Sequence, residues 1–156
     1  MRKKALALAA MLGAGTVLLH PAPAMAAAYT PEAACAEQSG RGGWTHVSDN
    51  KRAVKHRGST WGHVYLMWNR ASQQNCVAMI KTRYAGKSTY TQAILKVQGG
   101  GAYRDPGTLT ARTYKYYAAA IGYGKGQCVD FEGKTTNGTR NYATAVGKRG
   151  RLANCG

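Results

Sequence analysis

The sequence is poor in acidic residues. Only six of its 156 residues are Asp or Glu, against 22 Lys and Arg, so its formal net charge at pH 7 is +16. A charge of this size favours attraction to polyanions such as wall polymers, nucleic acid or acidic lipid surfaces. The same charge also suits a soluble protein without a dedicated ligand, because net charge does not define a specific site.

The chain also lacks the short motifs that mark common enzymes and metal centres. It contains no Gly-x-Ser-x-Gly, no His-Glu-x-x-His and no glycine-rich phosphate loop that opens a helix. It has no Cys-x-x-Cys, and no two of its four cysteines have the spacing of zinc ligands. The sequence therefore predicts no metal centre and no cofactor, and no motif assigns a catalytic residue.

Residues 1–26 have the organisation of a cleaved signal peptide. A basic segment at residues 2–4 precedes an apolar run over residues 5–19, and a small-x-small pattern ends at Ala26. The apolar run is short for a segment that crosses a bilayer. We expect cleavage after Ala26 and export of residues 27–156 as one secreted domain. Because the removed segment holds three of the basic residues and none of the acidic ones, the net charge falls from +16 to +13.

The four cysteines, Cys35, Cys76, Cys128 and Cys155, all follow the expected cleavage position. An even number of cysteines in an oxidising compartment predicts two disulfides. We favour the pairing of Cys35 with Cys76 and of Cys128 with Cys155, which would staple the two ends of the domain separately. The sequence leaves the other two pairings open.

Short segments of alternating side chains, separated by Gly, Asn and Ser, make up the rest of the chain. Together with ten Tyr and 20 Gly, this pattern is typical of an all-β fold, a single small antiparallel sandwich or barrel-like domain. A helical turn could interrupt the pattern at residues 118–120, and no repeat, linker or second domain is indicated. The expected strands cover residues 44–47, 62–68, 76–83, 90–98, 111–118, 127–132 and 139–146.

Two segments concentrate the basic residues. The sequence KRAVKHR at residues 51–57 lies between turn-forming residues, which predicts an exposed loop or edge segment that attracts anions. The second segment, residues 134–151, combines basic residues with Tyr142. Such a mixture can follow a polynucleotide by charge and stacking, although tyrosines also pair across ordinary sheets. The candidate anion-binding residues are Lys51, Arg52, Lys55, Arg57, Arg140, Lys148, Arg149 and Arg151.

Two of the six acids lie close together at Asp130 and Glu132. A strand over residues 127–132 would turn Val129 and Phe131 toward the core and both acids to the outside. The simplest interpretation of this acid pair is that it forms ion pairs with Lys or Arg of neighbouring strands. The sequence assigns it no further role.

The histidines leave a secreted hydrolase open as an alternative function. A ribonuclease would combine a histidine with a carboxylate, or two histidines, as general acid and base, and would place Arg or Lys on the phosphate. No spacing in this sequence links such residues. The residues of suitable type are His46, His56, His63, Asp130, Glu132 and Arg140.

Five segments, spread with the cysteines over about 120 residues, resemble one family. They are GHVYLMWN at 62–69, NCV at 75–77, KVQGGGAYRDPG at 96–107, YYAAAIGYGKGQCVDFEG at 116–133 and NCG at 154–156. Their order and spacing are similar to those of the secreted spore-associated protein A family of actinobacteria. The chain departs from the family pattern at Tyr103 and Phe131, where the pattern has Trp, and at Glu132, where it has Gly.

The resemblance implies a small exported protein with no established activity, no cofactor and no catalytic residues to assign. We therefore expect a secreted, basic, disulfide-stabilised protein of the spore or cell envelope that lacks enzymatic activity. Its expected partners are anionic polymers of the cell wall or spore surface, with non-specific binding of nucleic acid. The alternatives are a small hydrolase such as a ribonuclease acting on an anionic polymer, and a secreted inhibitor-type binding protein.

Overall fold

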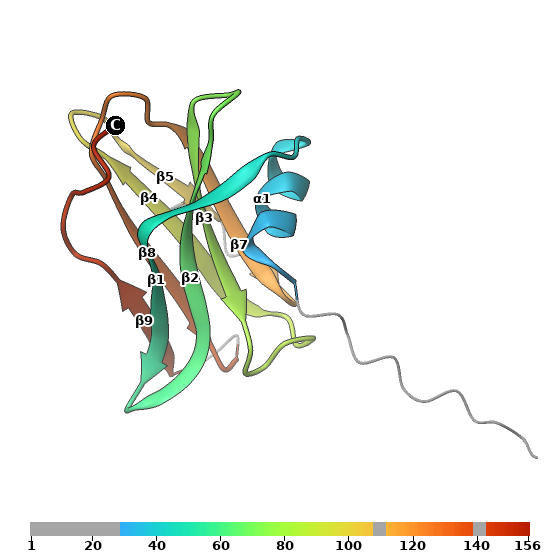
Figure 1. Cartoon of the computed structure of the whole chain (residues 1–156). Coiled ribbons are helices and arrows are strands. Elements are labelled where there is room, and N and C mark those ends of the chain that lie inside the picture. The colour runs from blue at the N-terminus through green and yellow to red at the C-terminus, as the bar shows by residue number, and fades with distance from the viewer. Residues whose placement is uncertain (1–28, 108–111, 139–142) are drawn as a thin grey trace, which may run out of the picture.

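Figure 1 shows the fold in a computed structural model, which describes residues 29–107, 112–138 and 143–156. Strands dominate the described residues, and both expected disulfides are present, so the predicted all-β fold and the predicted cysteine pairing are confirmed. The elements are α1 (Pro31–Ser39), β1 (Trp44–His56), β2 (Ser59–Asn69), β3 (Gln74–Lys81), β4 (Thr89–Val97), β5 (Ala102–Asp105), β6 (Thr113–Tyr114), β7 (Tyr117–Tyr123), β8 (Val129–Thr136) and β9 (Thr144–Lys148).

The strands form an antiparallel, nearly closed barrel-like sheet. Their order is β5-β4-β8-β9-β1-β2-β3-β7, and β6 pairs with β4 outside this path. The two end strands approach each other across a seam, where the backbone N–H of Ala119 donates to Asp105 Oδ2 at 3.0 Å. A Cβ atom on Gly122 would lie 2.3 Å from the ring of Tyr103. The seam therefore depends on a glycine, which lets the aromatic ring of β5 pack directly on the backbone of β7.

The main hydrophobic core fills the inside of the barrel. Val129 and Phe131 are fully buried there, as the alternation in the sequence predicts. A Cβ on Gly133, the next inward position, would lie 2.7 Å from Val64. The barrel is thus narrow enough that side chains fill it. The core consists of Val54, Trp61, Val64, Leu66, Val77, Met79, Ala93, Leu95, Val97, Ala118, Ala120, Val129, Phe131 and Ala145.

A second, smaller core lies outside the barrel, under α1. The helix packs on the outer face of β3 and β7, and the Cys35–Cys76 disulfide joins it to β3. Thr30 caps the start of the helix, because its hydroxyl accepts a hydrogen bond from the Ala33 N–H, and Gly40 caps its end with a φ of 67°. This cluster contains Ala34, Cys35, Trp44, Met67, Cys76, Ala78, Ile80 and Ala119.

The second disulfide secures the C-terminal segment. Cys155 joins Cys128, which directly precedes β8. Next to it, Ala153 and Val129 exchange two backbone hydrogen bonds of 2.8 and 2.9 Å. The last residues therefore lie against the start of β8 at one end of the barrel (Figure 1).

The structure corrects two expectations from the sequence and contains one helix that the sequence did not indicate. Residues 51–56 are not a loop or an edge, because they lie in β1, which pairs with both β2 and β9, and only Arg57 lies in a turn. Residues 118–120 form no helical turn, because they lie in the middle of β7 and pair with β3. The chain also contains the helix α1, which the sequence did not indicate. The expected signal peptide and residues 139–142 of the last expected strand lie outside the described residues.

Candidate anion-binding surface

Strand β1 places part of the first basic segment on the outside of the barrel. Val54 is fully buried in the core, whereas Lys51 and Lys55 are exposed. Residues four apart on a strand lie on the same face, roughly 13 Å from each other. Arg57 is also exposed and forms the tight turn to β2 with Gly58, with φ angles of 46° and 81°.

Strand β9 adds a further cation to this face. Lys55 of β1 lies opposite Val146 of β9, whose side chain is 37% exposed. Lys148 is two residues beyond Val146, so it lies on the same outer face, and it is exposed. Parts of both basic segments of the sequence therefore meet on adjacent strands. We call Lys51, Lys55, Arg57 and Lys148 the β9–β1 surface.

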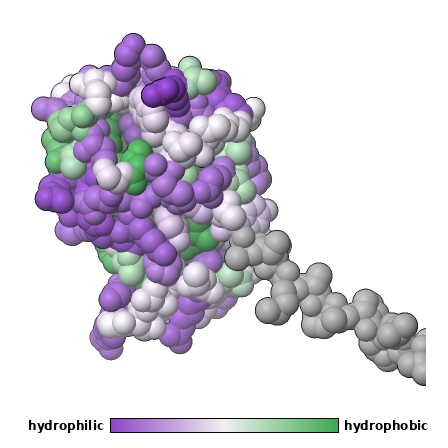
Figure 2. Space-filling view, in the orientation of Figure 1, coloured by the Kyte–Doolittle hydropathy of each residue, from purple (hydrophilic) through white to green (hydrophobic). Residues whose placement is uncertain are grey.

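The neighbouring strand β2 borders this surface with an aromatic ring and a histidine. Lys51 Nζ lies 5.4 Å from the centre of the Tyr65 ring, a cation–π distance. His63 lies next to Tyr65, with 6.2 Å between the ring centres. Burial, and then the positive charge of Lys51, lower the pKa of His63. Figure 2 shows that hydrophilic residues cover much of the face on which β1 and β2 lie.

The acidic residues do not neutralise the β9–β1 surface. Within the described residues, Lys51, Lys55, Arg57 and Lys148 have no carboxylate within ion-pair distance, because each acid contacts another group. The six acids and their partners are Glu32 with His46, Glu37 with the Tyr117 hydroxyl, Asp49 with Arg52 and Arg151, Asp105 with Tyr114 and Ala119, Asp130 with Lys96 and Arg149, and Glu132 with Lys96 and Lys134.

Glu132 forms one ion pair with Lys96 of the neighbouring strand β4, the kind of pair that the sequence predicts, and a closer one with Lys134 of its own strand. Its carboxylate lies 3.0 Å from Lys134 Nζ and 3.5 Å from Lys96 Nζ. Burial opposes its ionisation, but the hydrogen bonds and charges of Lys134 and Lys96 outweigh burial and hold the pKa of Glu132 below its usual value. The backbone of Lys148 lies directly opposite, yet the carboxylate is occupied by the other two lysines.

Asp130 is more deeply embedded than Glu132. It is 5% exposed, and its Oδ1 accepts from the backbone N–H groups of Phe131 at 2.8 Å and Gly150 at 3.1 Å. Lys96 and Arg149 add positive charge at 3.7 and 3.8 Å. Asp130 therefore holds the segment that follows β9 against β8, so its role is structural.

Arg149 and Arg52 belong to the same structural network and not to the exposed surface. The Arg149 side chain is fully buried and donates to the carbonyl oxygen of Val129 and to Asn154 Oδ1. Its burial lowers its pKa. The guanidinium carbons of Arg149 and Arg52 lie 5.0 and 5.8 Å from the centre of the Phe131 ring. Arg151 is exposed but lies 3.3 Å from Asp49, and Arg140 lies outside the described residues.

The structure does not bring the histidines and the β8 acids together. His63 lies on β2, whereas Asp130 and Glu132 lie on β8, and two strands separate them in the sheet. Three steps between strands amount to roughly 14 Å. His56 contacts the Thr144 carbonyl at 3.0 Å and packs on Trp61. Among the described residues, His63 is therefore not paired with either acid of β8.

One histidine–carboxylate pair was not expected from the sequence. His46 Nε2 lies 2.7 Å from Glu32 Oε1, and both side chains are nearly half exposed. The pair links β1 to α1, so it could be predicted only by knowing that the chain before β1 folds back as a helix. It lies over the outer face of the sheet, where Tyr65 is the adjacent aromatic ring, at 6.1 Å between centres.

Among residues 29–107, 112–138 and 143–156, no three His, Cys, Asp or Glu side chains gather as metal ligands would. In the same part of the chain, no helix has the length and apolar composition needed to cross a membrane. No protein-family model matches the chain, and neither a curated protein nor a solved structure matches it.

Proposed function

We propose that this is a secreted, non-enzymatic protein that binds anionic polymers of the cell wall or spore surface through its β9–β1 surface. The observation that carries the proposal is the placement of the acids. All six are engaged elsewhere, so exposed lysines on two adjacent strands face solvent without a carboxylate of the protein beside them. The resemblance to the spore-associated protein A family supports the proposed location.

The geometry of the surface suits a linear polymer. Lys51 and Lys55 are roughly 13 Å apart along β1, and Lys148 stands one strand away, at about 4.8 Å. Lysine acts as a point charge without the fixed fork of arginine, so such a row tolerates variation in the position of successive anionic groups. The same cations would also attract nucleic acid without regard to its sequence.

Binding to purified cell walls tests the proposal. The wild-type domain should co-sediment with walls and be released as salt rises, because charges on an exposed surface are screened over about 10 Å at 0.1 M salt. The triple variant Lys51→Gln, Lys55→Gln, Lys148→Gln should bind roughly tenfold more weakly, since each exposed charge pair contributes about 0.2–1 kcal/mol.

A matched control variant has the same net charge as this triple variant but leaves the β9–β1 surface unchanged. Arg41, Arg70 and Lys115 are exposed, and none has a carboxylate partner among the described residues. The triple variant Arg41→Gln, Arg70→Gln, Lys115→Gln should keep most of the affinity. Equal losses in the two variants would show that net charge, not the β9–β1 surface, determines binding. Binding that salt does not weaken would also contradict the proposal.

A further inference from the structure

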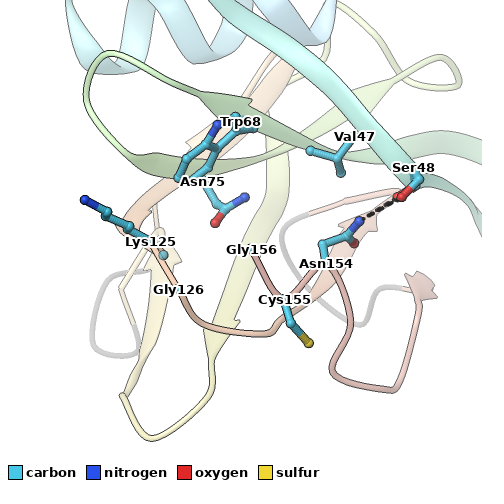
Figure 3. Close-up of a pocket in the computed structure, with 10 residues that line it drawn as sticks. Val47, Ser48, Trp68, Asn75, Lys125, Gly126, Asn154, Cys155 and Gly156 are labelled. Carbon is cyan, nitrogen blue, oxygen red and sulfur yellow. Dashed lines mark hydrogen bonds between the residues drawn. The ribbon is translucent and has the colours of Figure 1, made fainter.

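A pocket of about 360 Å³ opens at the end of the barrel where the C-terminal segment lies (Figure 3). Four separate parts of the chain form it, and the disulfide between Cys128 and Cys155 holds two of them together. Its volume lies at the lower end of the range of about 300–1,000 Å³ for small-molecule sites. The lining residues are Val47, Ser48, Trp68, Asn75, Gly124, Lys125, Gly126, Asn154, Cys155 and Gly156.

Asn75 provides a buried amide in this pocket. The residue is 4% exposed, and its Nδ2 donates to the Met67 carbonyl at 3.3 Å. Its Oδ1 accepts no hydrogen bond from the described residues and, unlike Trp61 Nε1 and Ser72 Oγ, is not fully buried, so it is open to the pocket. A Cβ on Gly124 would lie 2.1 Å from this oxygen, so the amide is held against a glycine backbone. A donor on a bound molecule would satisfy Oδ1.

Trp68 provides a flat apolar wall next to Asn75, as Figure 3 shows. It is partly exposed, whereas Trp44 and Trp61 are only 5% and 4% exposed. Within the described residues the indole Nε1 donates to no group, so it remains free to donate to a ligand. A molecule bound in the pocket would therefore change the solvent accessibility of Trp68, and with it the quenching of tryptophan fluorescence.

The opposite wall is polar and rigid. Asn154 Nδ2 donates to the carbonyl oxygen of Ser48 at 3.0 Å and to its hydroxyl at 3.1 Å (Figure 3). The Ser48 hydroxyl acts as an acceptor there, so its own proton is left for a ligand. Asn154 is fixed in turn by the buried Arg149. The exposed Lys125 at the rim adds a flexible donor.

We propose that this pocket binds one pyranose ring of a saccharide. An indole face stacks on the C–H groups of a sugar ring, while hydroxyl groups around the ring exchange hydrogen bonds with an amide, a hydroxyl and an amine. The volume suits a single ring and not a length of polymer. This inference goes beyond the proposed function, because it concerns a compact ligand that is held by stacking and hydrogen bonds at a separate site.

Quenching of tryptophan fluorescence by acrylamide tests the inference, with glucose, N-acetylglucosamine and glucuronate as probes and glycerol as a polyol without a ring. At least one sugar, and not glycerol, should protect the accessible tryptophan in the millimolar range. Trp68→Phe should remove the quenchable signal and so assign it. Ser48→Ala should weaken protection severalfold, and Asn75→Leu, checked for a cooperative melt, at least tenfold.

Two further results separate this site from the β9–β1 surface. The triple variant Lys51→Gln, Lys55→Gln, Lys148→Gln should keep its protection by sugar, whereas Asn75→Leu should keep its binding to cell walls. Absence of protection by all three sugars would overturn the inference. Equal protection in wild type and in Ser48→Ala and Asn75→Leu would overturn it as well, because the sugar would then act elsewhere.

Discussion

The two sides of the barrel differ in what covers their outer faces. On one side, α1 lies over β3 and β7, and the outward residues Ala78 and Ala119 are fully buried. On the other side, β9 and the part of β1 from Lys51 to His56 are not covered by the helix, and the outward residues Lys55 and Val146 are exposed (Figure 1). The same alternation thus gives an apolar outer row where a helix packs and a row with exposed lysines where the outer face meets solvent.

The comparison also explains the composition of individual strands. Strand β3 is buried on both faces, and its central residues 76–80 are all apolar. Strand β1 is buried on one face only, and its outward positions are free to carry charge. A strand that keeps exposed lysines on a rigid sheet, away from the acids of the same protein, is the feature on which the proposed function depends.

The largest expected effect comes from placing a charge on the covered side. Ala78→Lys should lower the free energy of unfolding by about 3–5 kcal/mol, because the ammonium group would lie under α1 without a partner. The equivalent outward change on the uncovered side, Val146→Lys, should alter it by no more than about 0.5 kcal/mol. Urea unfolding monitored by circular dichroism measures both values, and similar losses in the two variants would contradict the comparison.

Removal of the Cys35–Cys76 disulfide should have the next largest effect. The double variant Cys35→Ala, Cys76→Ala should lose about 2–4 kcal/mol of stability. Hydrogen exchange should accelerate first in α1 and at the outward positions of β3 and β7, since this disulfide joins the helix to the sheet. Equal acceleration in β9 and β1 would show that the two sides do not respond separately.

Substitutions of the two acids of β8, Asp130 and Glu132, should lower stability by smaller amounts, which differ between the two residues. Asp130→Ala should cost about 1.5–3 kcal/mol, because it removes charged hydrogen bonds to the backbone of Phe131 and Gly150. Glu132→Gln should cost up to about 1 kcal/mol, since it loses ion pairs with partly exposed lysines. Thermal melts of both variants at pH 7 provide the test, and a larger loss for Glu132→Gln would reverse our assignment of Asp130 as the structural acid.

The effect of Glu132 should also depend on pH. Its pKa is lower in the folded protein than the usual 4.5, so its contribution to stability is present above that value and is lost as the pH falls through the folded pKa. The difference in stability between wild type and Glu132→Gln should therefore disappear in acid. A difference that persists at low pH would mean that packing, not charge, is lost in the variant.

A separate pH dependence of stability is expected from Lys81, the last residue of β3. This lysine is 4% exposed, and its Nζ donates to the carbonyls of Lys87 and Tyr114 and to Thr89 Oγ1. Burial, and then the charge of Lys87, lower its pKa to about 8. Between about 8 and the unfolded value of 10.5 the unfolded chain holds the proton more tightly, so the stability contributed by Lys81 rises with pH.

Urea unfolding between pH 7 and pH 10 measures this slope in wild type and in Lys81→Met. The Lys81→Met variant should lack this rise of stability with pH. The range ends at pH 10 because burial and Asp105 raise the pKa of Tyr114 to about 12, which gives an opposite slope at higher pH. Identical pH profiles in the two proteins would show that the folded and unfolded chains hold the Lys81 proton equally.

Most strands could be predicted because alternation is a local signal, but the strand expected over residues 111–118 is divided between β6 and the start of β7, and β5 was not expected. The alternation around Val129 and Phe131 places them in the core without knowledge of any other strand. Strand β1 could not be predicted in full, because a register shift between His46 and Lys51, with a φ of 51° at Asp49, interrupts its alternation. The pattern at that point indicates a loop, and only pairing with β2 and β9 makes it a strand.

Helix α1, the β9–β1 surface and the pocket beside Asn75 could not be predicted, for a different reason. Helix α1 is nine residues long and buries only Ala34 and Cys35, so its sequence carries too weak an apolar stripe to be recognised. The basic residues were identified as candidates, but their division between an exposed surface and the buried network of Arg149 depends on tertiary contacts. The pocket beside Asn75 is formed by residues from separate parts of the chain, and none of these parts alone has a sequence pattern that predicts a pocket.

Amide NMR spectra recorded during titration with a purified anionic wall polymer would test the central claim most directly. The account predicts that shifts concentrate at Lys51, Lys55 and Lys148 and their neighbours on β9, β1 and β2, and that they diminish as salt is added. The outward residues of β3 and β7 under α1 should not move. Shifts centred on those covered strands, or spread evenly over every exposed lysine and arginine, would contradict the account.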